Sequence, residues 1–162
     1  MSEAQETKDE KSERIEIRRF IPADVARVFS VVRDPEGHVT IDSTGMLQSW
    51  TGEPASKVGD EFVIHMDRES LNDYPMGKYD VTVKFTRYEH DRAIAWTIEG
   101  QIKPQIGHVY GYELEPVDGG TRVRESWDIS QEKVKAMVRP ARKRTIKAME
   151  ETLARIEQLV TT

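Results

Sequence analysis

The sequence contains no cysteine among its 162 residues. Disulfides, thiolate metal sites and cysteine nucleophiles are therefore excluded, and the composition fits a reducing compartment. No run of apolar residues approaches the length of a bilayer-spanning helix or of a signal-peptide core. We accordingly expect a cytoplasmic protein without an integral membrane segment.

Motifs for several kinds of chemistry are also missing. The sequence has no glycine-rich phosphate loop and no Gly-x-Ser-x-Gly elbow, so classical nucleophilic catalysis is not expected and we assign no catalytic residue. The four histidines are scattered, and no pair has the spacing of metal ligands with a carboxylate partner. We treat His38, His65, His90 and His108 as surface side chains, and we predict no metal and no cofactor.

The charge is unevenly distributed along the chain. A formal net charge of −5 argues against general affinity for nucleic acid, and we expect no such partner. Between Glu132 and Lys147, however, seven basic residues stand against one acidic residue. A solvated helical face explains this stretch most simply, while an anionic ligand, a membrane surface or a nucleic acid are the alternatives.

The remaining composition suits one folded domain with a short tail. With 37% apolar and 33% charged residues, the chain is long enough to bury a core. Residues 1–13 contain almost nothing apolar and mix Glu, Lys, Ser and Asp, so this segment is predicted to be a disordered tail. We expect residues 14–162 to form a single domain, whose oligomeric state the sequence leaves open.

The longest periodic segment is predicted to be an amphipathic helix over residues 140–160, beginning with Pro140 in its first turn. One edge of its apolar face carries only small or short side chains, at Ala141, Thr145, Ala148 and Thr152. Because large side chains normally fill a core, this edge indicates a cavity. Arg142 falls within the apolar sector, either reaching water at the domain edge or standing at a pocket mouth.

The rest of the pattern predicts one strand, a short helical pair and a six-stranded antiparallel meander. The first strand covers residues 14–21, a helix starts at Pro22, and Asp34-Pro35-Glu36-Gly37 ends it before a second short helix or turn over residues 38–42. The expected further strands cover residues 47–51, 61–67, 78–88, 92–98, 108–115 and 121–129.

Alternation within these strands assigns one apolar face to the sheet and one wet face. The terminal helix is the only long element able to cover the apolar side. The inward set is Phe62, Ile64, Met66, Tyr79, Val81, Val83, Phe85, Ile94, Trp96, Ile98, His108, Tyr110, Tyr112, Leu114, Val123, Glu125, Trp127 and Ile129.

This order of elements is a helix-grip arrangement in the α+β class, an antiparallel sheet curved around a long C-terminal helix. It resembles the START-like superfamily and, within it, the bacterial SRPBCC group of polyketide cyclase/dehydrase and lipid-transport proteins. The likeness spans about residues 14–160 and is carried by residues 15–19, Pro22-Ala23-Asp24-Val25-Ala26-Arg27-Val28-Phe29, Asp34-Pro35-Glu36, Val58-Gly59-Asp60-Glu61-Phe62, Ala93-Ile94-Ala95-Trp96 and Gly119-Gly120-Thr121-Arg122-Val123. The resemblance implies a deep, largely apolar cavity between sheet and helix that takes lipids, polyketides, hormones or other hydrophobic molecules.

Glu125 is the most informative polar residue, because alternation places it on the inward face between Val123 and Trp127. A buried carboxylate needs a partner or a proton. The inward-pointing candidates are Arg142, Tyr110, Tyr112 and His108, and such a pairing could be purely structural. We predict a ligand-binding set of Tyr79, Trp96, Tyr110, Tyr112, Glu125, Trp127, Arg142 and Met149.

Three classes of function stay open from the sequence. The first is a carrier or sensor that binds a small hydrophobic molecule, favoured because the inner face has few polar residues. The second is a polyketide cyclase, aromatase or dehydratase, a lyase-type activity using a Glu-Tyr-Arg group for acid–base chemistry. The third is a protein-interaction adaptor, which an exposed apolar patch would mark.

Overall fold

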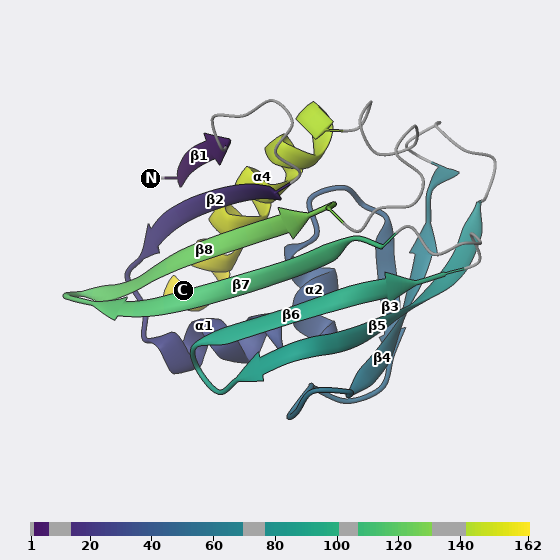
Figure 1. The fold of residues 1–162 in the computed structure, drawn as a ribbon, viewed down its shortest axis with the longest axis horizontal. Helices are drawn as coiled ribbons and strands as arrows, with labels where there is room; N and C mark the ends of the chain where they lie inside the picture. The colour runs from purple at the N-terminus through teal and green to yellow at the C-terminus, as the bar shows by residue number, and fades with distance from the viewer. Residues whose placement is uncertain (1, 7–13, 70–76, 101–106, 131–141) are drawn as a thin grey trace.

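Eight antiparallel strands form a single sheet, with the helices on one face of it (Figure 1). The computed structural model describes residues 2–6, 14–69, 77–100, 107–130 and 142–162. The strand order is β1-β2-β8-β7-β6-β5-β4-β3. The elements are β1 Ser2–Glu6, β2 Arg14–Ile21, α1 Val25–Val32, α2 Pro35–Ile41, β3 Leu47–Thr51, β4 Glu61–Asp67, β5 Lys78–Glu89, β6 Ala93–Glu99, β7 Val109–Val117, β8 Gly120–Asp128 and α4 Arg142–Thr161.

This architecture confirms the expected helix-grip fold, with two short helices after β2 and a long helix at the C-terminal end. Strands β2, β3 and β4 have the predicted bounds, and the bounds of the other predicted strands differ by two residues or fewer. Consecutive strands from β3 to β8 each pair antiparallel with the next, and short turns join β5 to β6 and β7 to β8. Predicted positions Pro140 and Ala141 lie outside the described residues.

The boundary between the two short helices differs from the sequence interpretation. Asp34 is the N-cap of α2, and its carboxylate accepts a hydrogen bond from the backbone N–H of Glu36 at 2.9 Å. Pro35 follows at the first helical position, where its fixed φ favours a helix start. The tetrapeptide beginning at Asp34 therefore opens the second helix, whereas the sequence interpretation had it closing the first.

Strand β1 was not expected from the sequence. Residues 2–6 were assigned to a disordered tail, whereas the structure pairs them with β2, from Ser2 opposite Arg19 to Glu6 opposite Ile15. Backbone pairing along the exposed edge of β2 needs no apolar side chains, so hydrophobic periodicity gives no signal for it. Residues 7–13 lie outside the described part of the chain, and the domain boundary at residue 14 stays a prediction.

The core lies between the inner sheet face and the helices. Helix α4 turns Met149, Leu153, Ile156 and Val160 inward. It packs against β1, β2 and β8 and also against α1 and α2. The other two helices cover further strands, α1 contacting β7 and β8, and α2 contacting β3 and β4. The sequence interpretation that α4 alone covers the sheet is therefore wrong, because three helices share that role.

Helix α4 is held at its C-terminal half by side chains from distant parts of the chain. Arg19 forms an ion pair with Glu157 at 2.9 Å. Arg27 donates to the backbone carbonyl of Val160, and Arg155 donates to the carbonyl of Asp42 at 2.8 Å. Carbonyl groups in the last turn of a helix have no partner within the helix, so Arg27 satisfies one of them.

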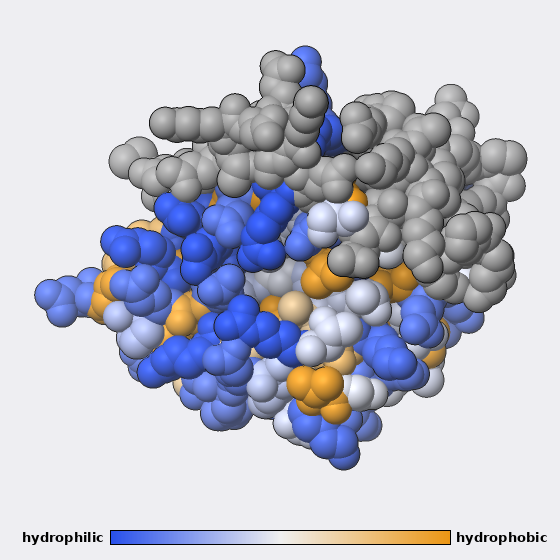
Figure 2. Space-filling view, in the orientation of Figure 1, coloured by the Kyte–Doolittle hydropathy of each residue, from blue (hydrophilic) through white to orange (hydrophobic). Residues whose placement is uncertain are grey.

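The outer face of the sheet is wet, as alternation predicts. Figure 2 shows mostly hydrophilic residues over the strands that face the viewer. Arg124 lies 2.9 Å from Glu113, and Arg14 lies 3.0 Å from Glu16, so charges of opposite sign alternate across β2, β8 and β7. Within the described ranges, no helix combines the length and apolarity needed to span a membrane.

Candidate functional site

Trp96 is the centre of an aromatic layer on the inner face. Strand pairing places Trp96 of β6 opposite Tyr110 of β7. The Trp96 ring stacks on Tyr110 at a centroid distance of 6.1 Å and on Tyr112 at 5.8 Å, with interplanar angles of 17° and 29°. The two tyrosines stand two residues apart on one face of β7, so both rings reach the same indole.

Glu125 faces this layer from β8 and is 7% exposed. Its strand position is directly opposite Tyr112, whose hydroxyl donates a hydrogen bond to Oε1 at 3.2 Å. Burial raises the pKa of Glu125 well above its ordinary value, so the fold favours the uncharged carboxylic acid. Burial, reinforced by the nearby Glu125, likewise raises the pKa of Tyr112. Glu125 is buried on the inner face as predicted, and of its four candidate partners the structure pairs it with Tyr112.

A second polar group lies beside this pair. Trp127 is 1% exposed, and the His108 ring packs edge-on against it at 5.6 Å. Nδ1 of His108 lies 3.2 Å from the Tyr110 hydroxyl. Burial lowers the pKa of His108 to about 4 and raises that of Tyr110 to about 12, so both are neutral near neutral pH.

Three buried polar atoms of this region have no hydrogen-bond partner in the part of the chain that the structure describes. They are Oε2 of Glu125, Nε1 of Trp127 and Nε2 of His108. A buried polar atom without a partner costs about 1–3 kcal/mol. Such atoms are few in native proteins, and a group of them on β8 and just before β7 calls for a ligand or an ordered water.

Arg68 joins the group, and the sequence analysis did not single it out. Its Nη1 donates to the Tyr79 hydroxyl at 3.3 Å. Burial is the main cause of the raised pKa of Tyr110; the charge of Arg68 partly opposes this rise, and the Tyr79 hydroxyl adds to it. The three side chains are therefore neighbours. The available signal was alternation, since Arg68 lies two residues after the inward Met66 of β4.

The structure therefore brings together six of the eight predicted site residues: Tyr79, Trp96, Tyr110, Tyr112, Glu125 and Trp127. Met149 is buried on α4, where its side chain belongs to the core cluster. Arg142 stands at the start of α4 and is partly exposed. A ligand-binding role for each of the eight stays a prediction.

His38 was expected on the surface and is instead 7% exposed. Its Nε2 lies 2.7 Å from the carbonyl oxygen of Val32, so this nitrogen carries the proton and donates. The ring packs on Trp96 at 4.7 Å and edge-on against Phe62 at 5.2 Å. Burial lowers its pKa to about 4. Pro35 and Ile41 of α2, three residues before and after His38, are also buried. This helical spacing indicates that His38 faces the core, and the sequence analysis overlooked it.

His65 lies on the outer face between two neighbouring strands. Its Nε2 is 2.8 Å from the Thr51 hydroxyl, and its Nδ1 is 2.7 Å from a carboxylate oxygen of Asp80. This order of hydroxyl, imidazole and carboxylate is that of a hydrolytic triad. The Asp80 side chain is 62% exposed, however, and no pocket around the group is described. Among the described residues, no cluster of His, Cys, Asp and Glu could hold a metal.

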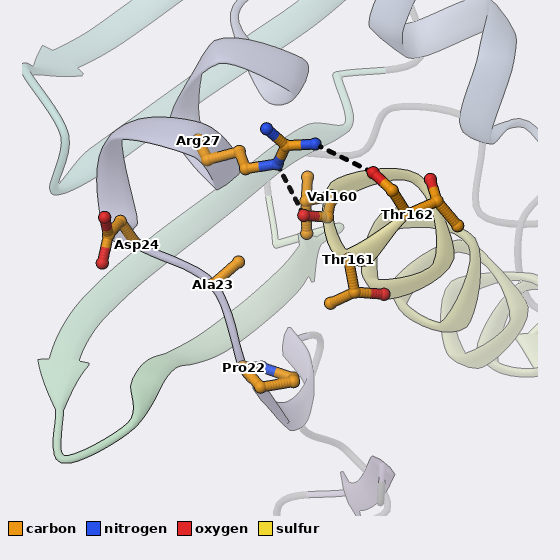
Figure 3. Close-up of a pocket in the computed structure, with 7 residues that line it drawn as sticks. All are labelled: Pro22, Ala23, Asp24, Arg27, Val160, Thr161 and Thr162. Atoms are coloured by element: carbon orange, nitrogen blue, oxygen red, sulfur yellow. Dashed lines mark hydrogen bonds between the residues drawn. The ribbon is translucent and has the colours of Figure 1, made fainter.

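A surface cleft of about 550 Å³ lies at the C-terminal end of α4 (Figure 3). Pro22, Ala23 and Asp24 line it on one side, and the last residues of the chain, from Val160, line it on the other. Arg27 reaches across to the carbonyls of the helix end. The cleft lies toward the end of β8 that pairs with Ile21, whereas the aromatic layer lies toward the other end of β8. It is distinct from the predicted site.

Fold and site together define a helix-grip protein whose inner sheet face carries an aromatic and partly polar lining. The sequence profile described as polyketide cyclase / dehydrase and lipid transport matches residues 12–161. The chain belongs to this family. The family and the fold indicate binding of hydrophobic molecules without specifying a ligand or a reaction. No curated protein matches the chain.

Solved structures share the fold at low sequence identity. Protein Ms6760 from Mycobacterium smegmatis is 16% identical with a TM-score of 0.71, and the alignment covers 98% of each chain. A protein from Arthrobacter aurescens is 19% identical with a TM-score of 0.69, and the alignment covers 98% of this chain and 91% of that protein. An AHSA1-like protein from Aeromonas hydrophila is 19% identical with a TM-score of 0.62, and the alignment covers 91% of this chain and 92% of that protein. These likenesses show the fold alone.

Proposed function

We propose that the chain binds a small hydrophobic molecule between the inner sheet face and α4, as a carrier or sensor. The aromatic layer around Trp96 forms the wall of the site, and Glu125 with its neighbours supplies the polar contacts. Ligand sites are mostly apolar with a few placed polar groups that fix orientation. The family membership supports the class of ligand, and the lining residues support the location.

One observation carries this proposal. Buried polar atoms of Glu125, Trp127 and His108 have no partner among the described residues, beside an aromatic face. A core serving stability alone would gain by pairing these atoms or by replacing them with apolar groups. A binding site, by contrast, uses polar atoms that are paired only when the ligand is present.

A cyclase, aromatase or dehydratase is the second candidate function. The Glu125–Tyr112 pair favours it, because a buried acid with a raised pKa can donate a proton in a water-poor site. The third member of the expected group, Arg142, is partly exposed at the start of α4. An adaptor role has less support, since the exposed large apolar residues Phe20, Trp50, Val58 and Leu159 come from separate elements and loops.

Fluorescence of the apolar dye phenylnaphthylamine tests the proposal. The protein is expected to bind the dye and raise its emission. Trp96→Leu should weaken dye binding by about tenfold, because a stacking aromatic contributes on the order of 1 kcal/mol or more. Trp50→Leu, at an edge strand with a 39% exposed indole, is the matched control and should leave binding unchanged. Equal effects of the two variants would place the dye elsewhere.

Native mass spectrometry of protein purified from its own host tests the same proposal without a chosen dye. A retained molecule of low mass, released by organic solvent, is the expected result. A protein that arrives without any such molecule and binds no apolar dye would contradict the proposed function.

A further inference from the structure

We infer that the ligand presents an uncharged acceptor oxygen, such as a ketone or ester carbonyl, and that Glu125 and Trp127 donate hydrogen bonds to it. This inference rests on the proposed function and specifies the chemistry of its ligand.

The two oxygens of Glu125 have different surroundings. Oε1 accepts the hydrogen bond of the Tyr112 hydroxyl, whereas Oε2 is buried with no partner among the described residues. Since Oε1 already acts as an acceptor, the proton of the neutral acid belongs on Oε2. Burial keeps the acid protonated, in agreement with its raised pKa. Glu125 thus offers a donor at Oε2.

Trp127 offers a second donor on the same face of β8, two residues further on. Its indole N–H can donate and cannot accept. Nε1 is buried and makes no well-formed hydrogen bond in the described ranges, although it is close enough to the Tyr110 hydroxyl to lower the pKa of that group slightly against the larger effect of burial. Two residues of a strand span about 7 Å, so both donors are within reach of one ligand head group or of two oxygens on one molecule. Two neighbouring donors require an acceptor.

The charges around the pair disfavour an anionic head group. The facing groups are Tyr112 and Tyr110 of β7 and His108 just before that strand, all neutral near neutral pH. On β2, Ile17 stands opposite Glu125, and the nearby Arg19 is already paired with Glu157 of α4.

Among the described residues no cation opposes the raised pKa of Glu125, although the charge of Arg68 acts on the neighbouring Tyr110. Arg68 donates to Tyr79 at the far side, and Arg142 lies at the start of α4. A buried carboxylate without a close cation costs several kcal/mol of desolvation, whereas a carbonyl is much cheaper to bury. The uncharged oxygen is therefore the acceptor that fits.

A competition experiment with three molecules of one chain length tests this inference. Phenylnaphthylamine bound to the protein is displaced with methyl hexyl ketone, n-octane and octanoate at about pH 7. The ketone is expected to displace the dye at a concentration about tenfold lower than octane does, the factor that one net hydrogen bond supplies. Octanoate is expected to be weaker than the ketone.

Two variants of Glu125 separate the donor from the shape of the side chain. Glu125→Leu should abolish the preference for ketone over octane and leave octane binding intact. Glu125→Gln keeps an N–H donor and should keep the preference. Raising the pH through the Glu125 pKa removes the proton that Glu125 donates, so the unaltered protein should lose its preference for ketone over octane. Glu125→Gln cannot ionise and should keep that preference at the same pH. Ser126→Ala, on the opposite face of the same strand, is the matched control.

Infrared spectroscopy of the bound ketone gives a readout that does not depend on affinity. The carbonyl stretch should move to lower frequency on binding, and Trp127→Phe or Glu125→Leu should each reduce that shift. If Glu125→Leu does not fold, Glu125→Gln and Trp127→Phe still decide the result. A shift that persists in both donor variants would mean that ordered water alone satisfies these atoms, and it would overturn the inference.

The remaining outcomes distinguish the two proposals. If neither dye nor ketone nor octane binds, the proposed function fails and the inference fails with it. If octane binds as tightly as the ketone, the apolar site stands and the acceptor-oxygen inference is wrong. Tighter binding of octanoate than of the ketone would also overturn it, and would assign the head group to a cation such as Arg68.

Discussion

The imidazole of His38 lies against the indole of Trp96, with ring centroids 4.7 Å apart. The contact joins helix α2 to the centre of the sheet, because Trp96 also stacks on both tyrosines of β7. His38 donates from Nε2 to the Val32 carbonyl, which holds the ring in one orientation. A neutral histidine is thus built into the wall beside the candidate site.

This burial makes stability depend on pH. The pKa of His38 is lowered from 6.5 to about 4, so protonation below 6.5 favours the unfolded chain. The contribution of neutral His38 to the free energy of unfolding is fully present above pH 6.5 and is lost as the pH falls through 4. The loss amounts to about 3 kcal/mol. Urea unfolding at a series of pH values should show this slope, and His38→Gln should reduce it. Part of the slope should remain in His38→Gln, because burial also lowers the pKa of His108 to about 4. A slope as steep in His38→Gln as in the unaltered protein would exclude His38 as its origin.

Glu125 is expected to act in the opposite direction. Its folded pKa is raised, so its stabilising effect is fully present below the unfolded pKa and is lost as the pH rises through the folded pKa. Glu125→Gln cannot ionise and should therefore be more stable than the unaltered protein at about pH 8, with the difference shrinking toward pH 4. Thermal unfolding of both proteins across this range measures it. A constant difference at all pH values would mean that the pKa of Glu125 is the same in the folded and unfolded states, and would contradict its raised folded pKa.

Truncation of the terminal helix tests how much of the fold depends on it. Ile156 is fully buried, and Ile156→Ala should lower the free energy of unfolding by about 2–5 kcal/mol. Leu159, which is 38% exposed on the same helix, is the control, and Leu159→Ala should cost well under half as much. Chemical denaturation gives both values. If Ile156→Ala is neutral, α4 is not part of the core.

The N-terminal segment should be dispensable even though residues 2–6 pair with β2. Backbone hydrogen bonds exchanged with water contribute little net stability. Deleting residues 1–13 is expected to lower the melting temperature by no more than about 2 °C. Calorimetry of the truncated protein measures the change, and a much larger loss would show that β1 is part of the cooperative domain.

A small-to-large substitution tests for a cavity beside α4. Ala148 lies on the edge of α4 that carries small side chains and is only partly buried. Ala148→Leu should leave stability unchanged and weaken binding of phenylnaphthylamine, because a void accepts the added atoms at the ligand's expense. Overpacking a filled core would instead cost about 1–3 kcal/mol. A clear destabilisation measured by urea unfolding would contradict a cavity at this position.

Most of the fold could be predicted because its signals are local. Period-two alternation gives β3 and β4 their bounds, and the helical period gives α4 an expected range of 140–160 against the observed Arg142–Thr161. Strand β1 gave no such signal, since pairing with the edge of β2 uses only backbone groups. The start of α2 was misplaced because the cap at Asp34 was interpreted as a helix end.

The candidate site was predictable only in part. Alternation placed Glu125 and Trp127 inward, and the register of β7 and β8 then decided that Tyr112 is the partner of Glu125. His38 and Arg68 were missed although periodicity places both side chains inward, because the groups that they contact depend on how α2 and the end of β4 meet the sheet. Contacts of that kind come from tertiary packing, which sequence periodicity does not encode.

The central claim is that an apolar molecule binds against the inner face of the sheet, and the three tryptophans of the chain provide a direct test. Trp96 and Trp127 lie on the inner face, whereas Trp50 is 39% exposed on edge strand β3. The indole N–H signals of all three can be followed by nitrogen–proton NMR during titration with methyl hexyl ketone. The account predicts that the Trp96 and Trp127 signals shift with a common saturation curve while that of Trp50 stays in place. A shift confined to Trp50, or no shift at a saturating concentration of ketone, would contradict it.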